Sequence, residues 1–396
     1  METSHSSSGP GDSGASPNLT SDLAVVRDSS EARRYNRILR CIGLADFALG
    51  LAVMAVLLAT DWTGSLRNLA IHLAGDCHAL ALFLYTTVLL GLTKFFSLGL
   101  DYYSFLIEHR YHLSNQRLRG WAWDQAKGFA LAFVFGQLLV QALYFLIRMQ
   151  PQWWWVTAWA LFMALMVLLA QIAPVVLFPI FFRFRTLKDE ELTARLTRLC
   201  ERAGTRVRGA YEWMLSEKSK KANAALMGLG RTRRIVISDT LLATCNHDEI
   251  ESVLAHELGH HVHRHIFKSM AVRCVVTFFG FWCVKTAVRW SAANWRHYGQ
   301  IDFASLPLMI LVATAVSVVL VPVMNAYLRY NERQADLYAW RTLGTVGPFC
   351  SAMEKLAGLN LAEREPSRWV EVLFHSHPAI GRRMKAAMTW AGTRRA

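Results

Sequence analysis

The sequence predicts a mainly α-helical, multi-pass membrane protein, and three observations support this fold class. The chain of 396 residues is 53% hydrophobic and has a mean hydropathy of +0.23, which is more apolar than an ordinary soluble enzyme. Six long, nearly uncharged runs occur along it. The segments between them include one large hydrophilic block at 183–267. We therefore expect about six transmembrane helices and a water-exposed domain.

Each apolar run is long enough to cross a hydrocarbon core of about 30 Å. The six predicted spans are 41–60, 78–100, 128–147, 154–181, 270–288 and 305–327. Helices buried in one large soluble core would be the alternative, but six such runs in one chain argue against it. The predicted segments are a tail (1–35), a four-span membrane domain (36–182), a hydrophilic part (183–267), a membrane hairpin (268–327) and a second hydrophilic part (328–396).

The composition of the N-terminal tail and the spacing of the cysteines argue against a signal peptide and against cysteine-based cross-links or metal sites. Residues 1–35 are rich in Ser, Gly and Asp and have no apolar run, so we expect this tail to be disordered. It also lacks the apolar core of a signal peptide. The seven cysteines are scattered without a CxxC pair, which argues against a disulfide framework or a cysteine zinc site.

Basic residues are distributed unequally among the loops. The 61–77 and 291–304 loops have one arginine each, whereas the 102–127 loop has Arg110, Arg117, Arg119 and Lys127. Cytoplasmic loops carry an excess of Lys and Arg, so both termini, this basic loop and the 183–267 block are expected in the cytosol. This topology and attraction to anionic lipid explain the formal net charge of +14, and no nucleic-acid partner is expected.

The most informative motif is the HExxH sequence that runs from His256 to His260. In a helix, its two imidazoles lie on one face, about 6 Å apart along the axis, and can bind one Zn²⁺. Glu257 then lies beside the open metal position and can accept a proton from water. The motif makes a zinc metallopeptidase the leading hypothesis.

The residues around the motif predict the helix that this chemistry needs. Asn246, followed three residues later by Glu249, resembles a helix-capping pair. Apolar residues then recur at helical spacing, at Ile250, Val253, Leu254 and Leu258.

An excess of histidine follows the motif, at His261, His263 and His265. It permits an alternative, a membrane di-iron oxygenase built from histidine boxes. Such a site needs several His-rich clusters, but the rest of the chain offers only the sparse pairs His109/His112 and His375/His377. We interpret His261 and His263 as solvated residues of the helix face.

A catalytic zinc needs a third protein ligand, and the sequence after the sixth span offers one. If that helix continues beyond the membrane, Glu332 and Asp336 lie one turn apart on the same face. Glu332 can then ligate zinc while Asp336 accepts a hydrogen bond from a ligand imidazole. A solvated acid pair is the alternative.

Several motifs in the same order resemble the integral-membrane gluzincins that include the type I CAAX prenyl endopeptidases and the heat-shock membrane peptidases. These motifs are HELGH at 256–260, ERQAD at 332–336, Asn223-Ala224 followed by RRIVISDTLL at 233–242, the Tyr102–Glu108 segment, Ala173-Pro174 through Pro179, and His377-Pro378 with Arg383. The resemblance covers about residues 90–390.

The resemblance implies roles for individual residues. His256, His260 and Glu332 would bind one zinc ion, with Glu257 as general base and later proton donor. Two further pairs complete the implied site: Asn223 and Ala224 on an edge strand that pairs with extended substrate, and His377 and Arg383 near the developing oxyanion.

The sequence therefore predicts a zinc-dependent membrane endopeptidase with a cytosol-facing gluzincin domain, formed from 183–267 and 328–396, that carries a small edge-strand sheet. Its partners would be the lipid bilayer and membrane-associated or prenylated-type peptides, and the Ala- and Arg-rich composition favours a bacterial cell membrane.

The sequence departs from the prenyl endopeptidases in two ways: it has six predicted spans instead of seven, and its segment 328–331 is unusual. Both departures put the prenylated substrate in doubt. Two alternatives stay open: a broad quality-control protease of membrane proteins, and a catalytically silent membrane scaffold. The sequence leaves the oligomeric state undetermined.

Overall fold

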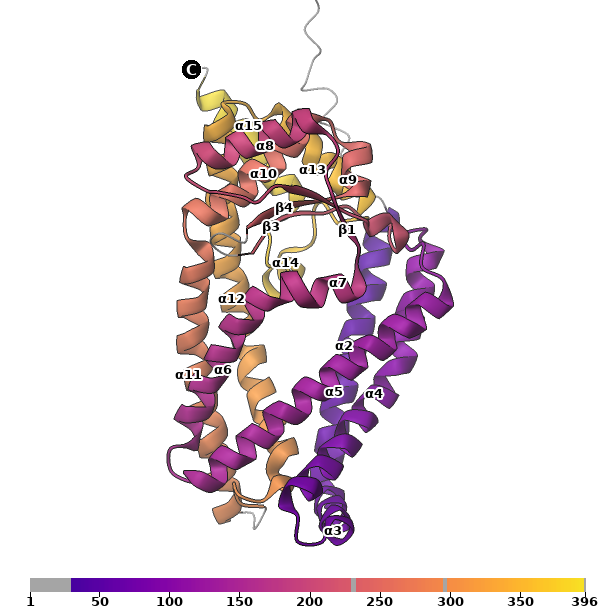
Figure 1. The fold of residues 1–396 in the computed structure, drawn as a ribbon, viewed down its shortest axis with the longest axis vertical. Helices are drawn as coiled ribbons and strands as arrows, with labels where there is room; N and C mark the ends of the chain where they lie inside the picture. The colour runs from indigo at the N-terminus through magenta and orange to yellow at the C-terminus, as the bar shows by residue number, and fades with distance from the viewer. Residues whose placement is uncertain (1–29, 229–232, 295–297, 395–396) are drawn as a thin grey trace, which may run out of the picture.

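Long helices form most of the protein, and a small sheet with shorter helices closes one end of them (Figure 1). The computed structural model describes residues 30–228, 233–294 and 298–394. Up to residue 29, the predicted tail lies outside the described residues. The prediction of disorder is wrong for 30–35, which are helical. Tyr35 helps to hold this part of the helix, because its buried hydroxyl donates a hydrogen bond to Glu108 at 2.8 Å.

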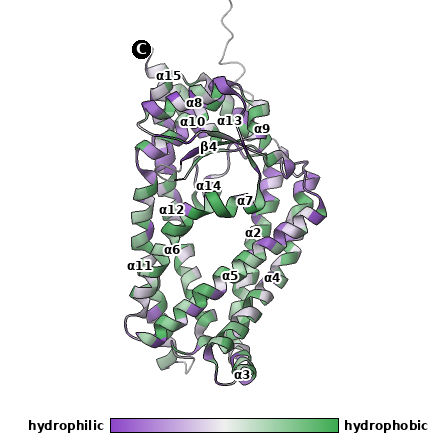
Figure 2. Ribbon diagram, in the orientation of Figure 1, coloured by the Kyte–Doolittle hydropathy of each residue, from purple (hydrophilic) through white to green (hydrophobic). Residues whose placement is uncertain are grey.

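Six helices among the described residues are long and apolar enough to cross a membrane, as predicted. They are α2 (Ser30–Ala59), α4 (His78–Arg110), α5 (Leu118–Met149), α6 to α7 (Trp154–Phe181), α11 (His265–Asn294) and α12 with the short turn before it (Phe303–Leu343). Only 0 to 28% of the residues in their most apolar windows are buried. Hydrophobic residues dominate these helices (Figure 2), and exposed helix faces of this kind are stable against lipid rather than water.

The helices reach further than the predicted spans at the end that carries the sheet. Because α4 and α5 continue beyond the apolar runs, the predicted 102–127 loop shrinks to 111–117. This short loop pairs with the hydrophilic block through a β-bridge between Ser114 and Ser219. The basic loop and the hydrophilic block therefore lie at the same end of the molecule, as the charge pattern predicts.

The opposite end is closed by α3 (Trp62–Ala74), a short helix inside the predicted 61–77 loop. Thr63 Oγ1 donates a hydrogen bond to the Ala304 carbonyl at 3.0 Å. The two loops with few basic residues thus meet at the end away from the sheet.

The predicted span 154–181 is interrupted near its end. α6 (Trp154–Ile172) is followed by a π-helical turn (Ala173–Leu177) and then by α7 (Phe178–Phe181), which lies across the molecule beneath the sheet in Figure 1. Pro174 lacks an N–H group, so it cannot continue the regular α-helical hydrogen bonds.

The sheet has four strands in the order β1-β2-β4-β3. They are β1 (Phe184–Thr186), β2 (Ala210–Trp213), β3 (Ala224–Met227) and β4 (Arg234–Ser238). β2 and β4 are parallel, whereas β1 and β3 are antiparallel to their neighbours. β3 is therefore an edge strand, with β4 as its one neighbour in the described part of the chain.

One hydrophobic core joins the two hydrophilic parts of the sequence. The helices around the sheet are α8 (Glu190–Arg202), α9 (Asp239–Thr244), α10 (His247–Val262), α13 (Gly347–Leu359), α14 (Arg368–Phe374) and α15 (Ile380–Thr393). Leu199 and Ile235 from the first part share this core with Phe349 and Met384 from the second. Burial of each such side chain stabilises the fold by about 1.5–3 kcal/mol, and it holds together the two segments that carry the predicted site.

Candidate active site

The helix that carries the HExxH motif, α10, begins at a complete capping box. Asn246 Oδ1 accepts the Glu249 N–H at 2.9 Å, and Glu249 Oε2 accepts the Asn246 N–H at 2.8 Å. The four apolar positions predicted from helical spacing are all buried. These contacts confirm the predicted helix and fix the face on which the two motif histidines lie.

Gly259 lets α10 cross α12 (Leu306–Leu343) at close range. A Cβ atom at residue 259 would lie 2.7 Å from the Cα of Ala335 and 3.0 Å from its carbonyl oxygen. Close-packed interiors do not accommodate such contacts, so this crossing requires glycine. α12 runs unbroken out of the membrane part, as predicted, and brings Glu332 to the motif.

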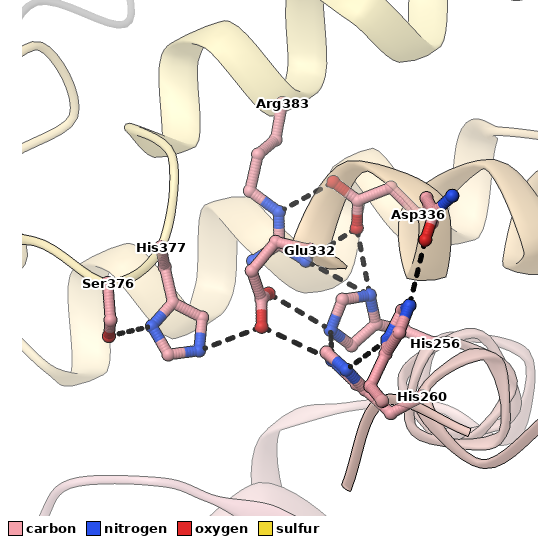
Figure 3. Close-up of polar contacts among 9 residues, drawn as sticks. His256, His260, Glu332, Asp336, Ser376, His377 and Arg383 are labelled. Carbon is pink, nitrogen blue, oxygen red and sulfur yellow. Dashed lines mark hydrogen bonds and ion pairs between the residues drawn. The ribbon is translucent and has the colours of Figure 1, made fainter. Parts of the chain in front are cut away.

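The structure brings the three predicted metal ligands together at this crossing (Figure 3). The Nε2 atoms of His256 and His260 are 3.3 Å apart, and they lie 3.3 and 3.2 Å from the two carboxylate oxygens of Glu332. Ligand atoms about 2.0–2.1 Å from a tetrahedral zinc ion are themselves about 3.3–3.4 Å apart. In addition, Glu332 Oε2 is buried without a hydrogen bond among the described residues, so the donor set fits a metal ion.

Asp336 lies one turn after Glu332 and holds the other side of His256. Its Oδ1 is 2.9 Å from His256 Nδ1. Arg383 in turn donates two hydrogen bonds to Asp336, from Nε at 2.9 Å and from Nη2 at 2.6 Å. The buried guanidinium therefore lies on the Nδ1 side of His256, away from the Nε2 atom that faces Glu332. The contact of Arg383 with the oxyanion stays a prediction.

Glu257 and His377 are the other predicted catalytic residues next to the ligand group. Glu257 lines a cleft together with His260 and Glu332. Burial raises the pKa of the Glu257 carboxyl above its usual value, and the nearby histidines oppose this rise. His377 Nε2 is 3.3 Å from Glu332 Oε1, and its side chain is 64% exposed.

The cleft has a volume of about 390 Å³ and extends from the predicted ligands to two membrane helices. Met166 of α6, Met270 of α11 and Leu226 of β3 all line it. Asn331 also lines it, and its buried Nδ2 has no hydrogen-bond partner among the described residues.

The predicted substrate-binding residues lie at the start of the edge strand. Ala224 is the first residue of β3 and pairs with Ile237. Asn223 accepts the Ser238 N–H at 2.9 Å, and its own N–H donates to Ser238 Oγ at 2.9 Å. The inner side of this segment is thus occupied by β4, and its outer edge is the side where an extended chain can add.

Arg329 was not selected from the sequence as a site residue, but its contacts hold the segment that carries His377. Its Nη1 donates to the carbonyl oxygens of Glu371 at 2.9 Å and His375 at 2.7 Å, at the end of α14. Its position in the sequence could have indicated this role, because it lies one turn before Glu332 at the end of a membrane helix. An arginine there raises the free energy of the folded protein unless it has polar partners.

His265 was also missed as a contributor to the site. In the sequence it is one of an excess of histidines, yet it is 3% exposed and its Nδ1 lies 3.0 Å from Nδ1 of His260. Among the described residues, the single His, Cys, Asp and Glu group able to hold a metal ion is His256, His260 and Glu332, so no histidine-box cluster is found there.

Comparison with known proteins agrees with this architecture. The chain matches the model of peptidase family M48 over residues 186–391. It matches the CAAX prenyl protease N-terminal model, described as five membrane helices, over residues 17–183. The described residues of that region contain four candidate spans and the 13-residue α3.

Two curated relatives and one solved structure extend the match. The chain is 31% identical over 304 residues to an uncharacterized metalloprotease, YhfN, of Bacillus subtilis, covering 76% of this chain and 71% of the relative. It is 26% identical over 386 residues to CAAX prenyl protease 1 of Saccharomyces cerevisiae, covering 90% and 84%. The crystal structure of S. mikatae Ste24p has the same fold, with a TM-score of 0.79 at 24% identity over 90% of this chain and 87% of that one.

The membrane helices, the metal-ligand group at the crossing of α10 and α12, and these matches lead to one conclusion. The chain belongs to peptidase family M48 and is an integral-membrane metalloendopeptidase related to the CAAX prenyl proteases.

Proposed function

We propose that the protein is a zinc-dependent endopeptidase that cleaves extended peptides of the membrane-associated or prenylated type. One Zn²⁺ per chain would be held by His256, His260 and Glu332. The observation that carries this proposal is the cleft, because His260 and Glu332 of this ligand group, the edge strand β3 and side chains of two membrane helices line one space.

Bound zinc would polarise the scissile carbonyl and lower the pKa of a water molecule toward about 7. Glu257 is the proposed general base, which takes the proton from that water and later gives it to the leaving amine. Its raised pKa suits both steps, because a carboxyl group with a pKa closer to neutrality holds the proton between them.

The remaining predicted residues support this chemistry. We propose that His377, at the open side of Glu332, donates to the oxyanion that develops on the substrate. For Arg383 we propose a positioning role in place of the predicted oxyanion contact, because its Nε and Nη2 are both engaged by Asp336. Asp336 would thereby hold His256 in the tautomer that leaves Nε2 free to ligate.

Substrate binding would use backbone hydrogen bonds. An extended peptide that adds to the outer edge of β3, beside Asn223 and Ala224, pairs its main chain with the strand in the way of β-augmentation. Apolar side chains of the cleft, such as Met166 and Met270, would contact a peptide that is held near the membrane. Two methionines offer adaptable apolar contacts.

Cleavage of one peptide in two forms tests this proposal. The forms carry the same sequence, with and without a prenyl group on a cysteine near the C-terminus, and are presented to the full-length protein in liposomes. We expect a higher kcat/KM for the prenylated form, because the lipid holds the peptide at the level of the cleft. The Glu257→Gln variant gives the background rate.

The same experiment separates the two alternatives. Equal rates for both forms, together with efficient cleavage of an unfolded membrane protein, would favour a broad quality-control protease. Zinc-loaded protein that cleaves none of these substrates would favour a catalytically silent scaffold.

We further propose that the catalytic domain faces the cytosol of a bacterial cell, since the basic loop lies at the same end as the sheet. Cysteines replacing Lys220 and Ala293, both exposed, should be labelled by an impermeant reagent from opposite faces in a cysteine-free background. Residue 220 should be reached from the cytosol. Labelling of both from one face would contradict the span count, and extracytoplasmic labelling of residue 220 would contradict the orientation.

A further inference from the structure

A buried histidine, His265, contacts the ring of the proposed ligand His260. His265 is the first residue of α11, and its Nδ1 lies 3.0 Å from Nδ1 of His260. Its Nε2 lies 2.9 Å from Oε1 of Gln334. The Gln334 amide nitrogen in turn donates to the Tyr330 hydroxyl at 3.1 Å. Four side chains therefore form an unbroken hydrogen-bonded series that begins at the ligand.

The backbone between α10 and α11 makes this contact possible. In a continuous α-helix, residue 265 would be rotated by about 140° from residue 260, too far round the axis for their rings to meet side by side. Arg264 instead adopts a left-handed conformation, with φ of 55°, and α11 begins directly after it. Residues other than glycine rarely adopt this conformation, and it persists where surrounding contacts determine it.

The ligand geometry fixes the direction of every hydrogen bond in the series. Nε2 of His260 faces Glu332 and His256, so a neutral ring that ligates through this atom carries its proton on Nδ1. His260 then donates to Nδ1 of His265, which acts as the acceptor. The proton of His265 is consequently on Nε2 and is donated to Gln334 Oε1. The amide nitrogen of Gln334 is left to donate to Tyr330, as the structure shows.

We propose that His265 is a positioning residue that fixes the tautomer and ring orientation of His260, and that Gln334 fixes the tautomer of His265. This inference rests on the zinc site proposed above. The two histidine ligands are supported differently: His256 contacts the carboxylate of Asp336, which is paired with Arg383, whereas His260 contacts a neutral imidazole. Outer hydrogen-bond partners of this kind commonly contribute about 10–100-fold to metal affinity.

Zinc affinity of the full-length protein in detergent, measured by competition with a chelator, tests the proposal without relying on activity. His265→Phe retains a ring but has no acceptor, so we expect zinc affinity to fall by about 10–100-fold. In His265→Asn, the side-chain oxygen can take the place of Nδ1 and accept from His260, so affinity should return toward the wild-type value. Gln334→Leu should fall between them, since His265 then loses the group that fixes its tautomer.

His263→Phe is the matched control. The ring of His263 stacks on that of His265 at a centroid distance of 5.5 Å, and phenylalanine preserves this contact. Its zinc affinity should be close to that of the wild type. The visible spectrum of the cobalt-substituted protein gives a second readout, which should change in His265→Phe and remain unchanged in His263→Phe.

Wild-type zinc affinity in His265→Phe would overturn the positioning role. The role would also be overturned if His265→Phe and His265→Asn lost zinc affinity equally and in proportion to their loss of thermal stability without zinc. A merely structural role predicts that pattern. If His265→Phe does not fold, the zinc affinities of the other two variants decide. Reduced affinity in Gln334→Leu with near-wild-type affinity in His265→Asn supports the positioning role, and wild-type affinity in Gln334→Leu overturns it. A wild-type protein that binds no zinc would instead overturn the proposed function.

Discussion

Replacing Glu257 with glutamine is expected to lower peptide turnover by about 10² to 10⁴ while the protein keeps its zinc. Glutamine has nearly the same shape as glutamate but cannot accept a proton from water. Glu257 lines the cleft beside His260 and Glu332, and it is not a member of the ligand group. The effect should therefore appear in kcat, with little change in metal content. Steady-state cleavage rates and metal analysis of the same sample measure both quantities.

Asp248→Asn is the control for this variant, since it makes the same acid-to-amide change on the same helix at a side chain that is 63% exposed. Its turnover should stay close to that of the wild type. Near-normal turnover in Glu257→Gln would exclude the proposed general base.

Replacing Glu332 with alanine is expected to lower both zinc occupancy and cleavage, because one of three protein ligands is lost. The carboxylate is buried, and its Oε2 has no hydrogen-bond partner among the described residues, which suits an oxygen that ligates a metal ion. Metal content after dialysis against a weak chelator measures the effect.

Arg333→Ala changes the neighbouring residue of α12, which is exposed, and should retain zinc. Full zinc retention in Glu332→Ala would remove Glu332 from the ligand set and leave the site with two histidines.

The sequence predicted those parts of the fold that depend on local pattern. Apolar runs identified all six candidate spans of the described residues, because few charged residues interrupt them. The capping pair Asn246 and Glu249 placed the start of the α10 helix correctly. The helices are longer than the predicted spans: α4, for example, continues past residue 100 to Arg110, where charged residues do not oppose a helix.

Other features depend on contacts between distant segments, which no local pattern records. Arg329 satisfies carbonyl groups more than forty residues later in the chain, and this partner is visible only after folding. His265 is adjacent to the motif in sequence, yet its contact with His260 requires the left-handed backbone of Arg264. The same limitation applied to Arg383, whose binding to Asp336 is a tertiary contact.

The most direct test of the central claim is to measure zinc content and peptide cleavage in one preparation of the full-length protein. The proposed site predicts about one zinc per chain, loss of cleavage when a chelator removes it, and recovery when zinc is returned. Cleavage that continues at the same rate in protein stripped of metal would contradict a zinc peptidase centred on His256, His260 and Glu332.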